Sequence, residues 1–473
     1  MQMNFCTYST GEVTMTATAA QDETSTQQLA PDEAVGRGLD EVLTTPVGEA
    51  VDEELAGTDG TADHPARERL GRPFGIHLGG VGLANLADGI IVGALPLVAI
   101  TLTRSPGQVS LLQVAFWLPW LLLGLVAGVV VDRVDRRHVQ LVGTAVRVLL
   151  LGAMTWLAVA DRLTMPVLIG AVGVYGITQV FIDLAGSSII PQLAPRSRLS
   201  AANGRVMGAE TVLNNFVGAP VGGLLLVLGT GWVFGVPVAL GLGFLVLIGL
   251  GLRGDYRAEQ AAPTGESRLR QVLEGFRFQM QHPVLRPLLV TGSVLNFAST
   301  AYFAVFVLWV VGPQSRVGLE PAQFPLLLAT LAVGAVAGAL AAEHLVKVVA
   351  EMPLLIGGWA VNSALLLVPV LVPQAWAICG AFLVVGFTNM CGNVVNRSMR
   401  QRLVPAEKLG RVGGAGGMIG YGLMPLGALL GGLVGEFLGL PAVFLGAVAL
   451  SLLVVLYAAT RVSTELVARH EIS

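Results

Sequence analysis

Ionisable side chains inside apolar segments are the residues of this chain best placed to do chemistry. Asp88 and Arg147 both lie well inside stretches long enough to cross a bilayer. A charge at that depth costs about 2.5–3.5 kcal/mol on insertion scales, so it should face a partner or an internal cavity. Burial disfavours the charged form of a carboxyl group, and Asp88 should therefore bind a proton more readily than an exposed acid. The chemistry that we expect is reversible protonation, without enzymatic activity.

Two interpretations of Asp88 stay open. It either carries a coupled proton or serves as a permanent counter-ion for Arg147, which has no partner within its own helix. For Arg147 itself, a structural role and a role in gating are both compatible with the sequence. Substitution of Asp88 by asparagine, which mimics the protonated acid, separates the two interpretations.

Polar residues recur at helical spacing in four of the apolar segments. Tyr175, Gln179 and Asp183 follow one another at i, i+4 and i+8, which places them on one stripe of a helix. The candidates for lining a substrate cavity are Asn85, Tyr175, Gln179, Asn296, Asn389 and Asn393. Each amide also has a plainer interpretation, a hydrogen bond to a neighbouring helix worth about 0.6 kcal/mol on average.

A short acidic and basic turn joins the second and third apolar segments. It contains Gly128, Asp132, Arg133, Arg136 and Arg137. This spacing resembles the loop signature of the major facilitator superfamily, G-x-x-x-D-R-x-G-R-R, with Asp135 at the usual glycine. The resemblance implies a conformational latch, a contact that holds one transport state closed, with Asp183 as the acidic partner of Arg136. The alternatives are a turn that only anchors the hairpin, and substrate binding by Asp183.

The composition is that of a membrane protein. Apolar residues make up 54% of the 473 residues and charged residues only 12%, about half the charged share of a soluble domain. Twelve apolar segments of bilayer length can be counted. They run over residues 75–102, 108–131, 138–160, 164–191, 205–228, 231–252, 287–311, 323–346, 352–372, 374–396, 410–436 and 439–460. We therefore predict an all-α membrane protein with twelve transmembrane helices.

The two halves of the chain repeat each other. Residues 204–206 and 410–412 both read Gly-Arg-Val, and Pro-x-Gly follows each, at Pro220 and Pro425. Parallel six-helix halves related by an axis along the membrane normal are a known way to build a transporter. The repeat predicts two pseudo-symmetric six-helix bundles. Antiporters of the superfamily often carry G-P-x-x-G-G in the fifth span, and here the proline comes one place late.

Basic residues predict the orientation. With the N-terminus inside, eighteen lysines and arginines fall on the cytoplasmic side and only Arg104, Arg162 and Arg316 on the other. Both termini of this multi-pass protein should then be on the cytoplasmic side of the plasma membrane. We expect a disordered cytoplasmic tail (1–72), an N-terminal bundle (73–253), a cytoplasmic linker with an amphipathic helix along the membrane surface (254–286), a C-terminal bundle (287–460) and a cytoplasmic tail (461–473).

Finer features resemble one branch of the superfamily. Asn85-Leu-Ala-Asp88-Gly89 in the first span and Glu274-Gly-Phe-Arg277 in the linker are similar to the branch of the enterobactin exporter and the macrolide efflux pumps. The resemblance implies efflux of an amphipathic small organic molecule by alternating access, driven by protons. Its partners would be that substrate, protons and the lipid bilayer, with no nucleic acid, and we expect a monomer.

Other functions stay open. A lipid or lysolipid flippase or an importer of the same fold would show nearly the same pattern, and a receptor or scaffold would need neither Asp88 nor the latch. No segment resembles the nucleotide-binding loop G-x-x-x-x-G-K-[ST], which leaves ATP drive unsupported. The three cysteines, Cys6, Cys379 and Cys391, have neither metal nor disulfide spacing. We expect no cofactor and no metal.

Overall fold

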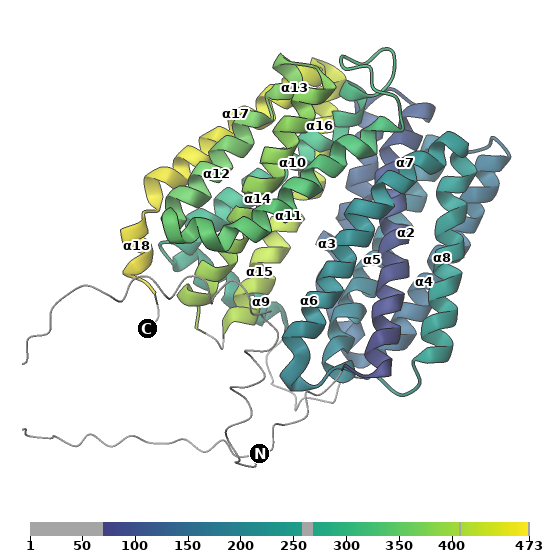
Figure 1. Ribbon diagram of the computed structural model, residues 1–473, viewed down its shortest axis with the longest axis horizontal. Coiled ribbons are helices and arrows are strands. Elements are labelled where there is room, and N and C mark those ends of the chain that lie inside the picture. Colours follow the sequence, from purple (N-terminus) through teal and green to yellow (C-terminus); the bar gives the residue numbers. More distant parts are fainter. Residues whose placement is uncertain (1–69, 258–267, 406–407, 472–473) are drawn as a thin grey trace, which may run out of the picture. The chain divides into compact units, whose positions relative to one another are not determined.

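The computed structural model describes residues 70–257, 268–405 and 408–471, and most of the predicted tail (1–72) lies outside them. The N-terminal half contains α2 (Arg72–Leu102), α3 (Pro106–Arg133), α4 (Arg136–Val159), α5 (Met165–Leu193), the short helix η1 (Arg196–Arg198), α6 (Leu199–Glu210), η2 (Thr211–Gly218), α7 (Ala219–Leu228) and α8 (Thr230–Gly251) (Figure 1). The C-terminal half contains α9 (Arg268–Gln281), α10 (Leu285–Val310), α11 (Gln323–Val348), α12 (Glu351–Leu365), α13 (Val368–Leu371), α14 (Ala375–Leu403), α15 (Leu409–Gly422), α16 (Met424–Leu438), α17 (Leu440–Arg461) and α18 (Thr464–Ala468).

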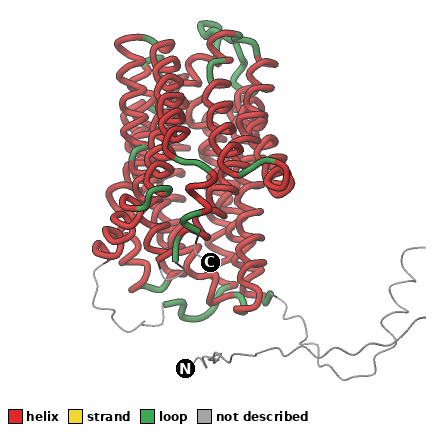
Figure 2. Tube along the Cα trace, turned by 90° about the vertical axis from the view of Figure 1, so that its left-hand side faces the viewer, coloured by secondary structure: helices red, strands yellow, loops and turns green. Residues whose placement is uncertain are grey.

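The all-α prediction is confirmed. Among the described residues, twelve helical segments are long and apolar enough to cross a membrane. Figure 2 shows the helices running alongside one another. The spans divide into an N-terminal bundle, α2 to α8, and a C-terminal bundle, α10 to α17. Three spans are interrupted, because α6, η2 and α7 together form the fifth, α12 and α13 the ninth, and α15 and α16 the eleventh.

Glycines let the first helix of each bundle approach its partner closely, and they do so at matching places. A methyl group added to Gly222 of α7 would lie 2.4 Å from the carbonyl oxygen of Ile90 in α2. One added to Gly427 of α16 would lie 2.3 Å from the carbonyl oxygen of Phe297 in α10. Small residues permit such backbone contacts in membrane helices. The sequence repeat therefore corresponds to a repeat in packing.

The fifth span explains how the displaced proline is accommodated. The backbone of η2 is π-helical from Thr211 to Gly218, directly before Pro220. A proline ring clashes with the carbonyl four residues earlier, and a widened turn relieves that clash. Gly218 still approaches Gly89, since a methyl group there would lie 2.7 Å from the Gly89 Cα. The span therefore packs closely against α2 although its proline is displaced.

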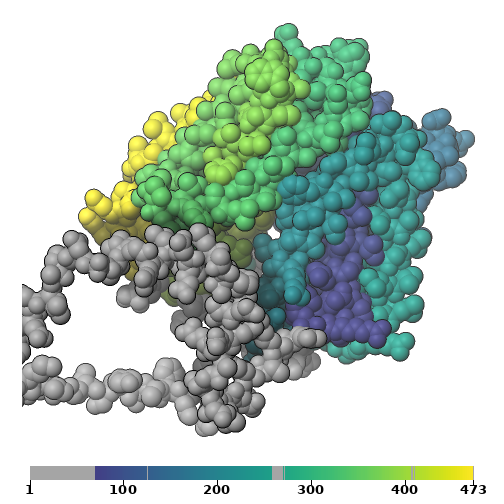
Figure 3. Space-filling view, viewed as in Figure 1, coloured from purple at the N-terminus to yellow at the C-terminus, as the bar shows by residue number. Residues whose placement is uncertain are grey.

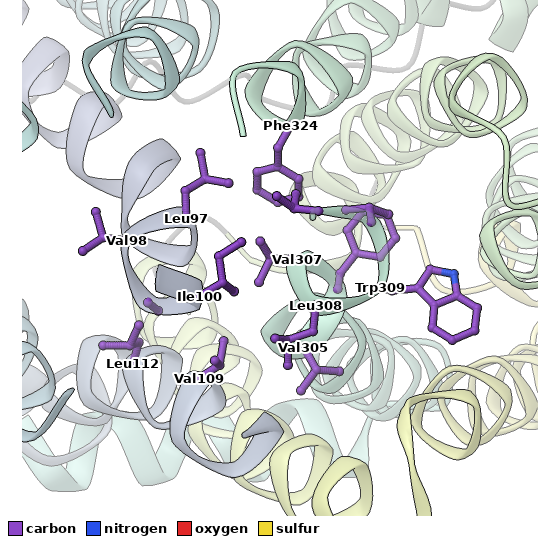
Figure 4. Packing of buried hydrophobic residues seen from close by; sticks show 14 of the residues in the cluster. Leu97, Val98, Ile100, Val109, Leu112, Val305, Val307, Leu308, Trp309 and Phe324 are labelled. Carbon is purple, nitrogen blue, oxygen red and sulfur yellow. The ribbon is translucent and has the colours of Figure 1, made fainter. Parts of the chain in front are cut away.

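The two ends of the bundles pack differently. We call the end where α3 stops at Arg133 and α4 starts at Arg136 the motif end, and the opposite one the far end. One apolar cluster joins both bundles at the far end, where Leu97 and Leu112 lie in the same cluster as Val305 and Phe324 (Figure 4). Figure 3 shows the green surface of the C-terminal bundle against the teal surface of the N-terminal bundle in the upper part of the view.

At the motif end the apolar clusters are separate. One contains residues of the N-terminal half only, such as Phe74 and Ile248. The other contains residues of the C-terminal half only, such as Leu285 and Met399. Because one apolar cluster is shared at the far end and the clusters are separate at the motif end, the two bundles are packed together at the far end.

The linker helix α9 packs against the C-terminal bundle. Its Glu274 forms an ion pair with Arg411 of α15, and Gln279 Nε2 donates to the Val412 carbonyl at 2.7 Å. Leu273 and Phe276 remain exposed on α9. The predicted position of this helix along the membrane surface stays a prediction. Past α17, the segment assigned to a tail contains the short helix α18, capped by Ser463.

Candidate functional site

The interior of the N-terminal bundle contains an ion pair. Arg147 Nη1 of α4 donates to Asp88 Oδ1 of α2 at 2.9 Å, and the two side chains are only 7% and 9% exposed. Arg147 Nε donates to Thr178 Oγ1 of α5, also at 2.9 Å. The pairing that the sequence left open is thus present. Two desolvated charges of opposite sign stabilise each other only with good geometry and further hydrogen bonds.

Two residues of the α5 stripe supply those further contacts. The Tyr175 hydroxyl donates to Asp88 Oδ1, and the Arg147 guanidinium lies over the Tyr175 ring, 4.1 Å from its centroid. Gln179 accepts from Arg147 Nη2 and donates through Nε2 to Asp88 Oδ2 at 3.3 Å. Tyr175, expected on a cavity wall, is 4% exposed and instead holds the ion pair.

Asp183 extends this cluster to an exposed surface. Gln179 Nε2 lies 2.9 Å from each Asp183 carboxylate oxygen. Asp183 itself is exposed, four residues nearer the motif end than Gln179. In this conformation its hydrogen bonds lead to the Asp88–Arg147 pair. Its pairing with Arg136 remains a prediction for another transport state.

The loop motif has a local structural role at two positions. Asp135 caps α4, since its carboxylate accepts from the Arg137 backbone N–H at 2.8 Å. The Arg137 side chain donates to the Ile248 and Gly249 carbonyls, at 3.4 and 2.6 Å, at the end of α8. Carboxylates are preferred caps at helix N-termini. Asp135 therefore has a clear reason to replace the usual glycine.

Two amides of the C-terminal bundle form a hydrogen-bonded pair without charge, in contrast to Gln179 and Asp183 of the N-terminal bundle. Asn393 Nδ2 donates to Asn389 Oδ1 at 2.9 Å, and both side chains are exposed. They share a face of α14 with Phe382, whose ring packs against Phe303 and Phe306 of α10. This face is turned toward α10 rather than outward.

Two other predicted residues make only local or weak contacts. Asn296 Nδ2 of α10 lies 3.4 Å from the Gly420 carbonyl of α15. Asn85 donates to the Val81 carbonyl of its own helix at 3.0 Å. The structural interpretation of the amides, a hydrogen bond to a neighbouring helix, therefore fits Asn296 in this conformation. Asn85 instead bonds within its own helix.

Polar contacts tie the bundles together at the far end. Glu436 of α16 accepts from the Ser105 hydroxyl at 2.7 Å and from the Gly107 backbone N–H at 3.1 Å, at the start of α3. Arg104 Nη1 donates to the Val311 carbonyl at 3.1 Å. A carboxylate is favoured beside the positive end of a helix. These contacts reinforce the closure of the far end.

Two residues of these contacts, Thr178 and Glu436, are not among the residues predicted from the sequence. Thr178 lies three residues after Tyr175 and one before Gln179, so the α5 stripe contained the signal for it. Glu436 is near the end of its span, where inserting a charge into the membrane has little free-energy cost. Its position in the sequence therefore did not indicate a functional role. Only the packing of α16 against α3 gives it a partner in the other bundle.

Twelve spans in two pseudo-symmetric bundles, with an ion pair buried in one of them, define the architecture of a secondary transporter. Residues 78–425 match the family model of the Major Facilitator Superfamily. The chain belongs to this superfamily, as its loop motif predicted. It is a multi-pass membrane protein of a transporter family and not an enzyme.

Its relatives include efflux pumps. The chain is 26% identical over 375 residues to the multidrug efflux pump Tap of Mycolicibacterium fortuitum, covering 76% of this chain and 89% of that protein. It is 28% identical over 396 residues to Tap of Mycobacterium tuberculosis, covering 77% and 87%.

Solved structures share the fold. The nucleoside transporter NupG superposes with a TM-score of 0.64 at 12% identity, covering 82% of this chain and 98% of that one. A bacterial homologue of the human lysosomal transporter Spinster, inward-facing and occupied, gives 0.62 at 15% identity, covering 86% and 99%.

Proposed function

We propose that this protein exports amphipathic organic molecules in exchange for protons by alternating access. The observation that carries the proposal is the Asp88–Arg147 pair inside the N-terminal bundle, connected through Gln179 to the exposed carboxylate of Asp183. Both carboxylates accept from the same Gln179 amide group, so the buried acid lies one side chain away from an exposed acid that can exchange protons with water. A purely structural ion pair would not need this second carboxylate.

Asp88 would change its neutralising partner during the cycle. In the present conformation it accepts hydrogen bonds from Arg147, Tyr175 and Gln179. Movement of α4 relative to α2 would remove Arg147 and leave Asp88 desolvated. Desolvation then favours the protonated acid. Pairing with Arg147 and binding of a proton would alternate.

The packing of the two ends supports a rocking motion of the bundles. The shared apolar cluster closes the far end, whereas the motif end has separate clusters. We take the motif end to be cytoplasmic, because most lysines and arginines of the loops lie there. The present conformation would then accept substrate from the cytoplasm. Asp132 and Arg136 would act when the motif end closes.

The direction of transport is proposed from the relatives. Proteins 26–28% identical to this chain are named multidrug efflux pumps. The α14 face that is turned inward offers the amides Asn389 and Asn393 rather than charges. Amides suit a weakly charged, amphipathic molecule.

Ethidium, a fluorescent amphipathic cation, provides the test. Cells that express the protein should accumulate less ethidium than cells with an empty vector, and a protonophore should abolish the difference. Proteoliposomes should show the same transport when a pH gradient is imposed. Equal accumulation with and without the protein, in cells where it is present and folded, would refute export of this class of molecule.

A further inference from the structure

A pair of aromatic rings joins the two bundles between their ends. Trp117 of α3 and Tyr421 of α15 stack with ring centroids 6.0 Å apart and ring planes within 1° of parallel. This is within the usual range for stacked aromatic side chains. The Trp117 ring is held in place, since its Nε1–H donates to Gln113 Oε1 at 3.2 Å and Phe116 packs edge-on at 5.3 Å.

The Tyr421 ring is half exposed, at 50%. Leu423 separates α15, which carries Tyr421, from α16 with its exposed leucines, so the direction of the ring follows from its own contacts. The contact with Trp117 of the other bundle agrees with an inward direction. The open face of Tyr421 is therefore turned toward the space between the bundles.

Glycines lie beside this ring on the motif side. Gly413, Gly414 and Gly417 precede Tyr421 in α15, and around Gly413 and Gly414 a methyl group would meet nothing within 4 Å. Met418 of the same helix is exposed, so a flat molecule approaching from the motif end would meet backbone and this one flexible side chain before it reaches the Tyr421 ring. Asp183 of α5, in the other bundle, has an exposed carboxylate.

We propose that Trp117 and Tyr421 form a stacking site for a planar aromatic ring of the exported molecule. The ligand ring lies on the open face of Tyr421 and extends the stack to three rings. This inference rests on the proposed export function and adds to it the class of substrate, planar aromatic cations. Because Trp117 holds the Tyr421 ring from the other bundle, rocking of the bundles removes this support, and the Tyr421 ring then turns and releases the ligand.

Two lipophilic cations test the proposal. Ethidium has a planar ring system, whereas the phenyl rings of tetraphenylphosphonium cannot lie in one plane. Tyr421→Leu keeps an apolar side chain but removes the stacking surface, and Trp117→Leu removes the ring that holds Tyr421 in place. Binding of ethidium to the purified protein should weaken by about 3- to 10-fold, with tetraphenylphosphonium binding nearly unchanged. Tyr421→Phe should retain ethidium binding.

The matched control is Trp232→Leu, which removes an exposed tryptophan of α8 and should leave both affinities unchanged. Export of ethidium by the wild type together with unchanged ethidium binding by both leucine variants would overturn the stacking site and leave the export function standing. Equal losses for both cations would show general apolar contact and also overturn it. Failure of the wild type to bind ethidium would overturn the site, whereas ethidium binding without export would count against the export function alone.

Discussion

Gln179 and Asp183 in the N-terminal bundle occupy the places that Asn389 and Asn393 occupy in the C-terminal bundle. Each pair follows a glycine, Gly176 or Gly386, at the same spacing, and both glycines lie against the backbone of a neighbouring helix. In each pair an amide donates across one helical turn at 2.9 Å. The pairs differ in direction and in charge, because Gln179 donates forward to the carboxylate of Asp183, whereas Asn393 donates back to the amide of Asn389.

This comparison separates what the fold requires from what the function adds. Glycine contacts such as those of Gly222 and Gly427 occur in both bundles, so they belong to the framework. The ion pair of Asp88 lies deep in the N-terminal bundle only. Among the described residues, the ion pairs of the C-terminal bundle lie near helix ends, as Arg402–Glu351 does. We infer that the buried charges serve transport rather than stability.

The largest expected effect comes from breaking the ion pair on one side. Arg147→Ala leaves Asp88 buried without a counter-ion, and this should cost about 3–5 kcal/mol of stability. The double variant Asp88→Asn, Arg147→Gln removes both charges and keeps hydrogen-bonding groups, so it should unfold close to the wild type. Thermal unfolding in detergent measures both. A single variant as stable as the wild type would show that the pair is already hydrated.

A smaller effect, equal in the two bundles, is expected from the glycine contacts. Gly222→Ala and Gly427→Ala each place a methyl group less than 2.5 Å from a carbonyl oxygen and should cost about 1–3 kcal/mol. The matched controls, Gly170→Ala and Gly380→Ala, add a methyl group where nothing lies within 4 Å. Unfolding temperatures should fall for the first two only. A lower unfolding temperature for only one of these two variants would contradict the equivalent packing of Gly222 and Gly427 in the two bundles.

Much of the fold could be predicted from the sequence. The number of spans and their division into six and six follow from the length and hydropathy of the apolar segments. Both properties can be read from each segment by itself, without knowledge of its neighbours in space. The π-helical backbone of η2 could not be predicted, because it depends on how Pro220 and Gly218 fit against α2. Whether residues after 460 form a helix was also beyond periodicity, since α18 has only five residues.

The candidate site could be predicted only where its signal lies within one helix or in buried charges of opposite sign. Spacing along one helix indicated the contact of Gln179 with Asp183, and opposite charges at depth suggested Asp88 with Arg147. The stack of Trp117 on Tyr421 joins residues far apart in the chain. In a membrane span an aromatic residue is as common toward lipid as toward the interior, and only the packing of the bundles distinguishes the two.

The central claim is that the charged cluster of the N-terminal bundle couples export to protons. Its most direct test is ethidium transport into proteoliposomes by the double variant Asp88→Asn, Arg147→Gln, with and without an imposed pH gradient. We predict that this variant binds ethidium and equilibrates it across the membrane but no longer accumulates it against its gradient. Proton-driven accumulation at the wild-type level by the folded variant would contradict the claim.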